Sequence, residues 1–170
     1  GETNLNYIFN SVFGINDKIY KTQVTMSNGY IADAILYAPE PLGTIAIDSK
    51  FPLEHYQIMT DQKKDKLERE LATKAFKQDV KKHIDAISSK YIIPGITSNQ
   101  AIMFLPAEAI FAEINAYHND LVEYAYKKNV WITSPTTLIS SLTTIQVLLK
   151  NMERDKYAKV VHEELIKLGI

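Results

Sequence analysis

Residues 44–50 read TIAIDSK, an apolar segment that ends in an acid and a lysine. Successive side chains of a β-strand point to opposite faces, so Asp48 and Lys50 are expected on one face, roughly 6.5 Å apart along the chain. Ile45 and Ile47 then occupy the other face. Charged groups are seldom buried unless they are paired or bound to a metal. The segment therefore predicts a core strand whose end carries either an ion pair or a functional site.

Two strands predicted before this segment form a hairpin with each other. The first covers residues 20–26 and the second covers residues 30–37. Between them, Asn28-Gly29 is the dipeptide most typical of a tight type I′ turn, because both positions need a positive φ. The strand at 44–50 follows after a short loop, so the three strands are expected to form a meander.

The expected pairing of the second and third strands brings another acid to Asp48. If Tyr37 faces Thr44 across the loop, four steps along each strand set Asp33 directly opposite Asp48. Opposed residues have Cβ atoms about 4.5–5.5 Å apart, and like charges there are destabilising. This register predicts a site for Mg²⁺ or Mn²⁺ between the two carboxylates, with Lys50 beside it. A surface ion pair worth under about 1 kcal/mol is the alternative.

The rest of the chain alternates between helical and strand patterns. The long helix is expected to bury a stripe made of Leu67, Leu71, Ala75, Val80, Ile84 and Ile87. The expected elements are a helix at 3–13, the long helix at 61–91, a strand at 101–105, a helical segment at 107–128 broken near 118–120, a strand at 130–133, and two helices after an N-cap at Ser134.

This order predicts an α/β fold with a mixed central sheet and flanking helices. The last three strands are linked by helices, so they are expected to include parallel pairs with right-handed crossovers. A meander that leads into such units places helices on both faces of the sheet. At 170 residues the chain is expected to form a single domain, with residues 150–170 as a C-terminal helical extension.

Composition limits the function classes without choosing among them. The formal net charge of −1 gives no overall attraction to nucleic acid, so a DNA-binding surface has to be a local patch. The absence of cysteine excludes disulfides and thiolate chemistry, and it suits a cytoplasmic protein. No apolar run is long enough to span a bilayer, and the first residues do not resemble a signal peptide. An anchor elsewhere in a longer protein is left open.

Several stretches resemble the RmuC family and, more broadly, the PD-(D/E)XK nucleases. They cover nearly the whole chain in order: Gly1-Glu2, Ala32-Asp33, residues 47–53 (IDSKFPL), Lys82-His83-Ile84, residues 103–108 (MFLPAE) and residues 134–138 (SPTTL). The resemblance implies a nuclease-like core in α-β-β-β-α-β order, which agrees with the order expected from the patterns.

The resemblance also implies roles for individual residues. Asp33 and Asp48 match the acids that ligate the metal, Lys50 matches the lysine that assists catalysis, and Glu2 matches a glutamate that often completes the site. Position 32 is alanine where the motif's name has proline, and that residue is not a ligand. Family members usually carry an N-terminal membrane anchor and a coiled coil, for which this chain has no matching segment.

A DNA-binding surface is predicted on the long helix. Residues 61–90 hold nine Lys or Arg against six Asp or Glu, and Lys81-Lys82-His83 is the densest part. Such a face can follow a phosphate backbone, although a solvated helix face is the plain alternative. The start of the helix after Ser134 can bind an anion, but capping is the simpler explanation.

Two functions remain open at this point. The first is a metal-dependent DNA nuclease acting in DNA recombination, in which Asp33, Asp48 and Glu2 hold Mg²⁺ or Mn²⁺ and Lys50 assists phosphodiester hydrolysis. The second is a non-catalytic DNA-binding module with the same fold that limits recombination or inversion. No nucleotide-binding loop or nucleophile-elbow motif occurs, which argues against NTPase and serine-hydrolase functions.

Overall fold

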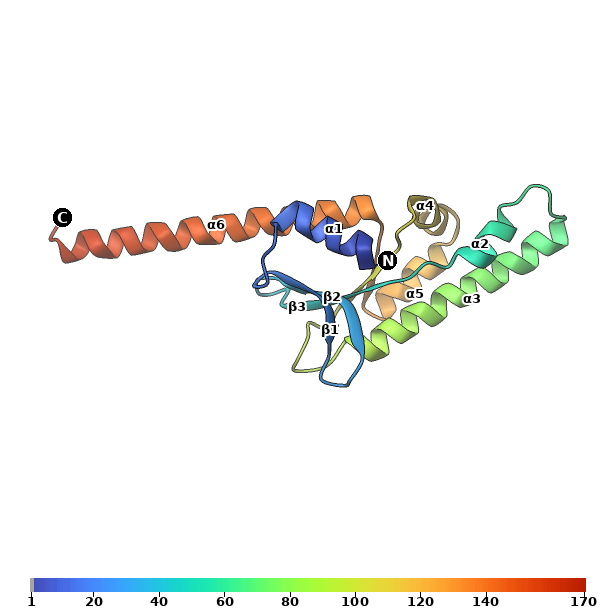
Figure 1. Ribbon diagram of the computed structural model, residues 1–170, viewed down its shortest axis with the longest axis horizontal. Coiled ribbons are helices and arrows are strands. Elements are labelled where there is room, and N and C mark those ends of the chain that lie inside the picture. The colour runs from blue at the N-terminus through green and yellow to red at the C-terminus, as the bar shows by residue number, and fades with distance from the viewer. Residues whose placement is uncertain (1) are drawn as a thin grey trace.

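Five strands form one mixed sheet with helices on both faces (Figure 1). The computed structural model describes the backbone of residues 2–170 and the side chains from residue 4 onward. In chain order the elements are α1 (Glu2–Phe13), β1 (Tyr20–Thr25), β2 (Ile31–Tyr37), β3 (Thr44–Ser49), α2 (Leu53–Met59), α3 (Lys66–Tyr91), β4 (Ala101–Phe104), α4 (Glu108–Tyr117), α5 (Asn119–Lys127), β5 (Val130–Thr133) and α6 (Pro135–Lys167).

The sheet follows the expected order and directions. Its strands lie in the order β1-β2-β3-β4-β5. The first three are antiparallel neighbours, while β3, β4 and β5 are parallel. Tyr37 pairs with Thr44, and the ladder continues in that register to Ala34 and Ile47. The predicted meander, the parallel pairs and the register of β2 with β3 are confirmed. The predicted type I′ turn is wrong, because Gly29 has a positive φ of 86° but Asn28 does not.

The two faces of the sheet contact different helices, and β3 shows the division most clearly. Ile45 and Ile47 belong to a buried cluster with residues of α1 and α6. Ala46, on the opposite face of β3, belongs to a cluster with residues of α3, α4 and α5. By alternation Asp48 lies on the face of Ala46, toward α3. The fold therefore directs the acid away from α1 and α6 and toward the long helix.

The long helix differs from the prediction at its start. It begins at Lys66, with Asp65 as N-cap, and not near residue 61. Leu67 and Leu71 are 66% and 58% exposed, so their predicted place in the buried stripe is wrong. The first turns of α3 reach beyond the sheet, where only α2 accompanies them (Figure 1). The helix buries the side chains Ala72, Phe76, Val80, Ile84, Ile87 and Tyr91.

Two other helical predictions are settled by the structure. The segment 107–128 is divided at His118 into α4 and α5, as expected. The chain after Ser134, predicted as two helices, is one continuous helix of 33 residues. Its apolar stripe changes face after Met152, which resembles a break, but no glycine or proline interrupts the segment.

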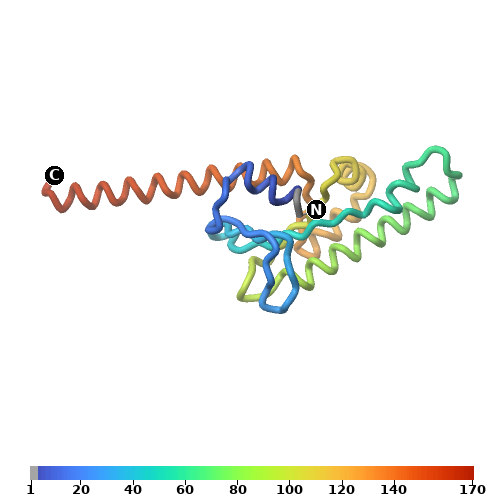
Figure 2. Tube along the Cα trace, in the orientation of Figure 1, coloured from blue at the N-terminus to red at the C-terminus, as the bar shows by residue number. Residues whose placement is uncertain are grey.

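The second half of α6 projects from the body of the molecule (Figures 1 and 2). Residues 150–170, the predicted helical extension, are exposed throughout. Ser134 caps the start of the helix, where its side chain accepts a hydrogen bond from the Thr137 N–H and the Thr137 side chain bonds back to Ser134. None of the described helices is long and apolar enough to cross a membrane.

Candidate active site at the end of strand β3

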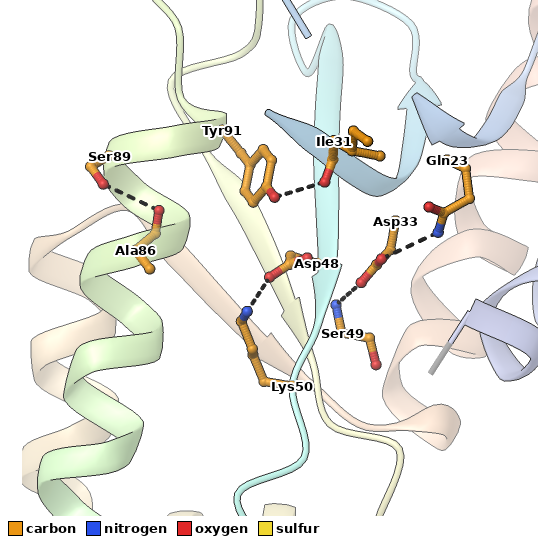
Figure 3. Close-up of polar contacts among 9 residues, drawn as sticks. All are labelled: Gln23, Ile31, Asp33, Asp48, Ser49, Lys50, Ala86, Ser89 and Tyr91. Atoms are coloured by element: carbon orange, nitrogen blue, oxygen red, sulfur yellow. Dashed lines mark hydrogen bonds and ion pairs between the residues drawn. The ribbon is translucent and has the colours of Figure 1, made fainter. Parts of the chain in front are cut away.

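The predicted acids and lysine meet where β3 ends (Figure 3). Asp33 lies in β2, Asp48 lies in β3, and Lys50 follows β3 directly. The ladder between β2 and β3 ends at the pair of Ala34 and Ile47. One residue further along each strand, the same register sets Asp33 opposite Asp48. Side chains from two antiparallel strands are thus gathered at one position of the sheet.

Asp48 and Lys50 form a partly buried ion pair. Asp48 is only 6% exposed, and its Oδ2 lies 2.9 Å from the Lys50 Nζ. The Lys50 backbone N–H donates to the Phe104 carbonyl at 2.9 Å, which fixes the start of this side chain against β4. The ion pair of the plain alternative is thus present, but its carboxylate is buried and has lost most of its hydration, unlike that of a surface pair.

Asp33 is held by neighbours on both sides. Its Oδ2 accepts a hydrogen bond from the Ser49 N–H at 2.7 Å, and its Oδ1 accepts one from the Gln23 amide at 3.3 Å. Gln23 lies in β1 with a φ of 51°, a left-handed conformation that is uncommon for a residue other than glycine. No sequence pattern distinguishes this glutamine from an ordinary strand residue. Its contact with Asp33 was therefore missed by the sequence analysis.

The environment of Asp48 disfavours its ionised form. Burial raises the pKa of this carboxyl above its ordinary value, the adjacent Asp33 charge raises it further, and Lys50 only partly opposes the shift. A raised pKa means that the folded state binds this proton more tightly than the unfolded state. The free energy of unfolding therefore gains most from Asp48 below its ordinary pKa and loses that gain as pH rises through the folded-state value. A cation beside Asp33 and Asp48 would offset the cost of ionising Asp48.

Tyr91 extends the site onto α3. Its hydroxyl donates to the Ile31 carbonyl at 2.8 Å, which ties the end of α3 to β2 (Figure 3). Burial, followed by the charges of Asp48 and Asp33, raises the pKa of Tyr91 to about 12. This hydroxyl therefore remains protonated and neutral beside the two acids. No sequence pattern distinguishes this tyrosine from an ordinary residue of a buried helix face.

Two carboxylates with one adjacent lysine fit a small divalent cation. Mg²⁺ is commonly bound through one or two carboxylates, with water and substrate phosphate as the other ligands. Among the described residues no group of three or more Asp, Glu or His side chains could hold a metal ion. The side chain of Glu2, predicted as a third ligand, lies outside the described part of the chain. The site thus offers Asp33 and Asp48 as the carboxylate pair.

Nearly the whole chain matches one known protein family. The model of the RmuC family matches residues 1–169. The chain belongs to the RmuC family. No solved structure gives a significant match to it.

Relatives with similar sequences belong to the same family. The chain is 31% identical to the DNA recombination protein RmuC homolog of Vibrio cholerae, over 88% of this chain and 30% of that protein. It is 28% identical to the homolog of Zymomonas mobilis over 96% of this chain and 37% of the relative, and 29% identical to DNA recombination protein RmuC of Escherichia coli K12 over 88% and 32%. The chain thus spans about a third of the length of these relatives.

In this RmuC-family chain the residues predicted to bind DNA do not form one surface. Consecutive helix positions are separated by about 100°, so Lys81, Lys82 and His83 point in different directions. Lys81 lies 5.5 Å from the ring centroid of Tyr124 on α5, and Lys82 is exposed to solvent. His83 lies on the other flank of α3, where burial, followed by the charge of Lys50, lowers its pKa. Of these three residues, His83 is the one on which a charge of the candidate site acts.

Side chains of this RmuC-family chain accept the hydrogen bonds of the free N–H groups at the start of α6. Glu108 Oε1 accepts a hydrogen bond from the Thr136 N–H at 2.8 Å, and Ser134 accepts one from the Thr137 N–H at 3.3 Å. The bonds from Thr136 hold the pKa of Glu108 below its ordinary value. These partners satisfy N–H groups that an anion would need. Capping therefore explains the segment 134–137.

Proposed function

We propose that this domain is a metal-dependent deoxyribonuclease of the PD-(D/E)XK type. The observation that carries the proposal is the buried Asp48, whose pKa is raised, in register with Asp33 and paired with Lys50. A fold places a costly acid beside a second acid when the arrangement serves a function, and perturbed carboxyls are concentrated at such sites. Asp33 and Asp48 are proposed to hold Mg²⁺ or Mn²⁺, and Glu2 is added by the family resemblance.

Each residue has a defined part in phosphodiester hydrolysis. A cation bound there would polarise the scissile phosphate and acidify the attacking water. Asp33 is kept in one orientation by the Ser49 N–H and Gln23, as a ligand should be. Lys50 stands beside Asp48 and is proposed to stabilise the charge that develops on the phosphate.

The biological role is proposed from the relatives. The relatives from Vibrio cholerae, Zymomonas mobilis and Escherichia coli carry the name DNA recombination protein, and the chain matches about a third of each. We extend this role to the chain and propose DNA as its partner. The PD-(D/E)XK assignment rests on the strand order and on the motif residues Asp33, Asp48 and Lys50.

A non-catalytic DNA-binding module is the second candidate. The observation that favours it is the ion pair of Asp48 with Lys50, which occupies a carboxylate oxygen that a cation would need. Mg²⁺ held by two carboxylates alone depends on water and on the substrate for its remaining ligands. A domain of this kind would bind DNA and limit its rearrangement without cutting it.

Cleavage assays on single-stranded, duplex and branched DNA distinguish the two candidates. The nuclease proposal expects cleavage of at least one substrate with Mg²⁺ or Mn²⁺, and none when EDTA is added. Gel electrophoresis of end-labelled DNA measures the products. Binding to all three substrates without cleavage of any would instead support the non-catalytic module.

A further inference from the structure

Three titratable side chains, His55, Asp79 and His83, lie on α2 and α3, the two helices that follow the end of β3 in the chain. His55 on α2 contacts Asp79 on α3, with 2.5 Å between the imidazole Nδ1 and the carboxylate Oδ2. His83 lies one helical turn after Asp79 on the same flank of α3. The His55 and Asp79 side chains are 31% and 36% exposed. The imidazole is therefore oriented by a carboxylate while part of it faces solvent.

Charges of the site and of the His55–Asp79 pair both act on His83. The pKa of His83 is lowered first by burial and then by the charge of Lys50, and Asp79 acts in the opposite direction. The charges of Lys50, in the site, and of Asp79, which orients His55, therefore both act on His83. The chain passes from Lys50 to α2 through only Phe51 and Pro52, which keeps His55 close in sequence to the end of β3.

Stability alone is a weak explanation for the pair of His55 and Asp79. Ion pairs exposed to this degree contribute little to folding, because solvent screens them and ordering the side chains costs entropy. The helix that carries His55 has no buried residue of its own. The pair does place one imidazole nitrogen against a carboxylate, which leaves Nε2 as the nitrogen available to another group.

We propose that His55, oriented by Asp79, and His83 bind a phosphate of the DNA backbone next to the phosphate held at the Asp33–Asp48 site. This assignment rests on the proposed function and specifies how the substrate lies on the domain. The bound strand passes along the flank of α3 that faces α2, and not along the flank where Lys81 packs on Tyr124.

The chemistry of the two rings fits a phosphodiester. A protonated His55 donates from Nδ1 to Asp79 and from Nε2 to a phosphate oxygen. A neutral His83 retains one N–H donor for a second oxygen. Lys50, which pairs with the buried Asp48, adds a positive charge that acts on His83. Contacts of this kind are independent of base sequence, as backbone recognition requires.

Asp79→Asn gives the sharpest test, because simple electrostatics predicts the opposite result. Removing a negative charge should tighten the binding of a polyanion. If Asp79 orients His55, the same change weakens binding about threefold or more, as does His55→Ala. Binding is measured by fluorescence anisotropy of a labelled single-stranded oligonucleotide in EDTA, at one fixed pH below neutrality and over a series of salt concentrations.

The salt series tests the phosphate contact itself. Loss of one phosphate contact on a single strand reduces the slope of log K against log salt by about 0.7. His55→Ala and Asp79→Asn should both show this reduction, and His83→Ala should weaken binding as well. His162→Ala, on the exposed part of α6, is the matched control and should bind like the wild type. Circular dichroism establishes that each variant is folded.

The outcomes separate this inference from the function on which it rests. Tighter binding by Asp79→Asn, or unchanged binding and slope in His55→Ala, would overturn the phosphate site while the nuclease proposal stands. If His55→Ala misfolds, the isosteric Asp79→Asn still decides. A wild type that binds no oligonucleotide would overturn the phosphate site, while the cleavage assays with Mg²⁺ or Mn²⁺ decide the nuclease proposal separately. Full cleavage by the Asp79→Asn variant with wild-type affinity would likewise contradict the assignment.

Discussion

Asp48→Asn is expected to abolish metal-dependent cleavage, with a loss of at least roughly 10³-fold in rate. The amide has the shape of the acid but lacks the charge that attracts a divalent cation. Asp48 is the more buried of the two proposed ligands whose side chains the structure describes, and water replaces its oxygen least easily. The rate is measured on whichever DNA substrate the wild type cuts, at saturating Mg²⁺ or Mn²⁺.

The same substitution should also remove the stabilisation that the cation provides. A ligand that binds only the folded state adds about 2.7 kcal/mol at roughly a hundredfold excess over its Kd. For a chain of this size that corresponds to a rise in Tm of about 5–10 °C. Asp17→Asn, in the exposed loop before β1, should cleave DNA and respond to Mn²⁺ as the wild type does. Cleavage that persists in Asp48→Asn would place the chemistry at another site.

Lys50→Ala is expected to separate metal binding from catalysis. The substitution leaves both carboxylates in place and removes the positive charge beside them. Loss of one group that stabilises developing charge typically costs about 10²–10³-fold in rate. The rise in Tm with Mn²⁺ should remain and even increase, because the cation then meets less repulsion. Single-turnover cleavage and thermal unfolding, measured on the same preparation, test both parts.

Lys18→Ala is the matched control, since Lys18 is exposed in the loop before β1. It should show wild-type cleavage and a wild-type response to Mn²⁺. If Lys50→Ala also loses the Mn²⁺ response, the lysine is needed to build the site and its proposed catalytic part is wrong. If its cleavage rate is unchanged, the lysine only neutralises Asp48.

The strand register could be predicted because the constraints on it are local. An Asn-Gly turn and a short loop fix the meander, and alternation then decides which face each residue occupies. These rules place Asp33 opposite Asp48 before any tertiary contact is considered. The Ser134 cap could also be predicted from the sequence, because its hydrogen bonds join residues within four positions of each other.

Features that depend on the edges of the structure could not be predicted in the same way. Leu67 and Leu71 continue the helical spacing of α3, but the sheet ends before it reaches them. The helix α2 spans only seven residues and buries none of them fully, so the apolar residues that it packs against the core, Leu53, Tyr56 and Met59, are too few to predict a helix by their spacing. The contacts of Asp33 with Gln23 and of His55 with Asp79 join separate elements. A glutamine or a histidine in the sequence does not indicate which distant residue it will contact.

A crystal of the domain soaked in Mn²⁺ tests the central claim, that Asp33 and Asp48 together hold a divalent cation. The anomalous difference map identifies manganese by its anomalous scattering, which distinguishes it from water. We predict a peak at the end of β3 with carboxylate oxygens of both acids about 2.0–2.6 Å away, and the side chain of Lys50 displaced from Asp48. Manganese bound elsewhere, or carboxylates that keep their present partners in a crystal saturated with Mn²⁺, would contradict the claim.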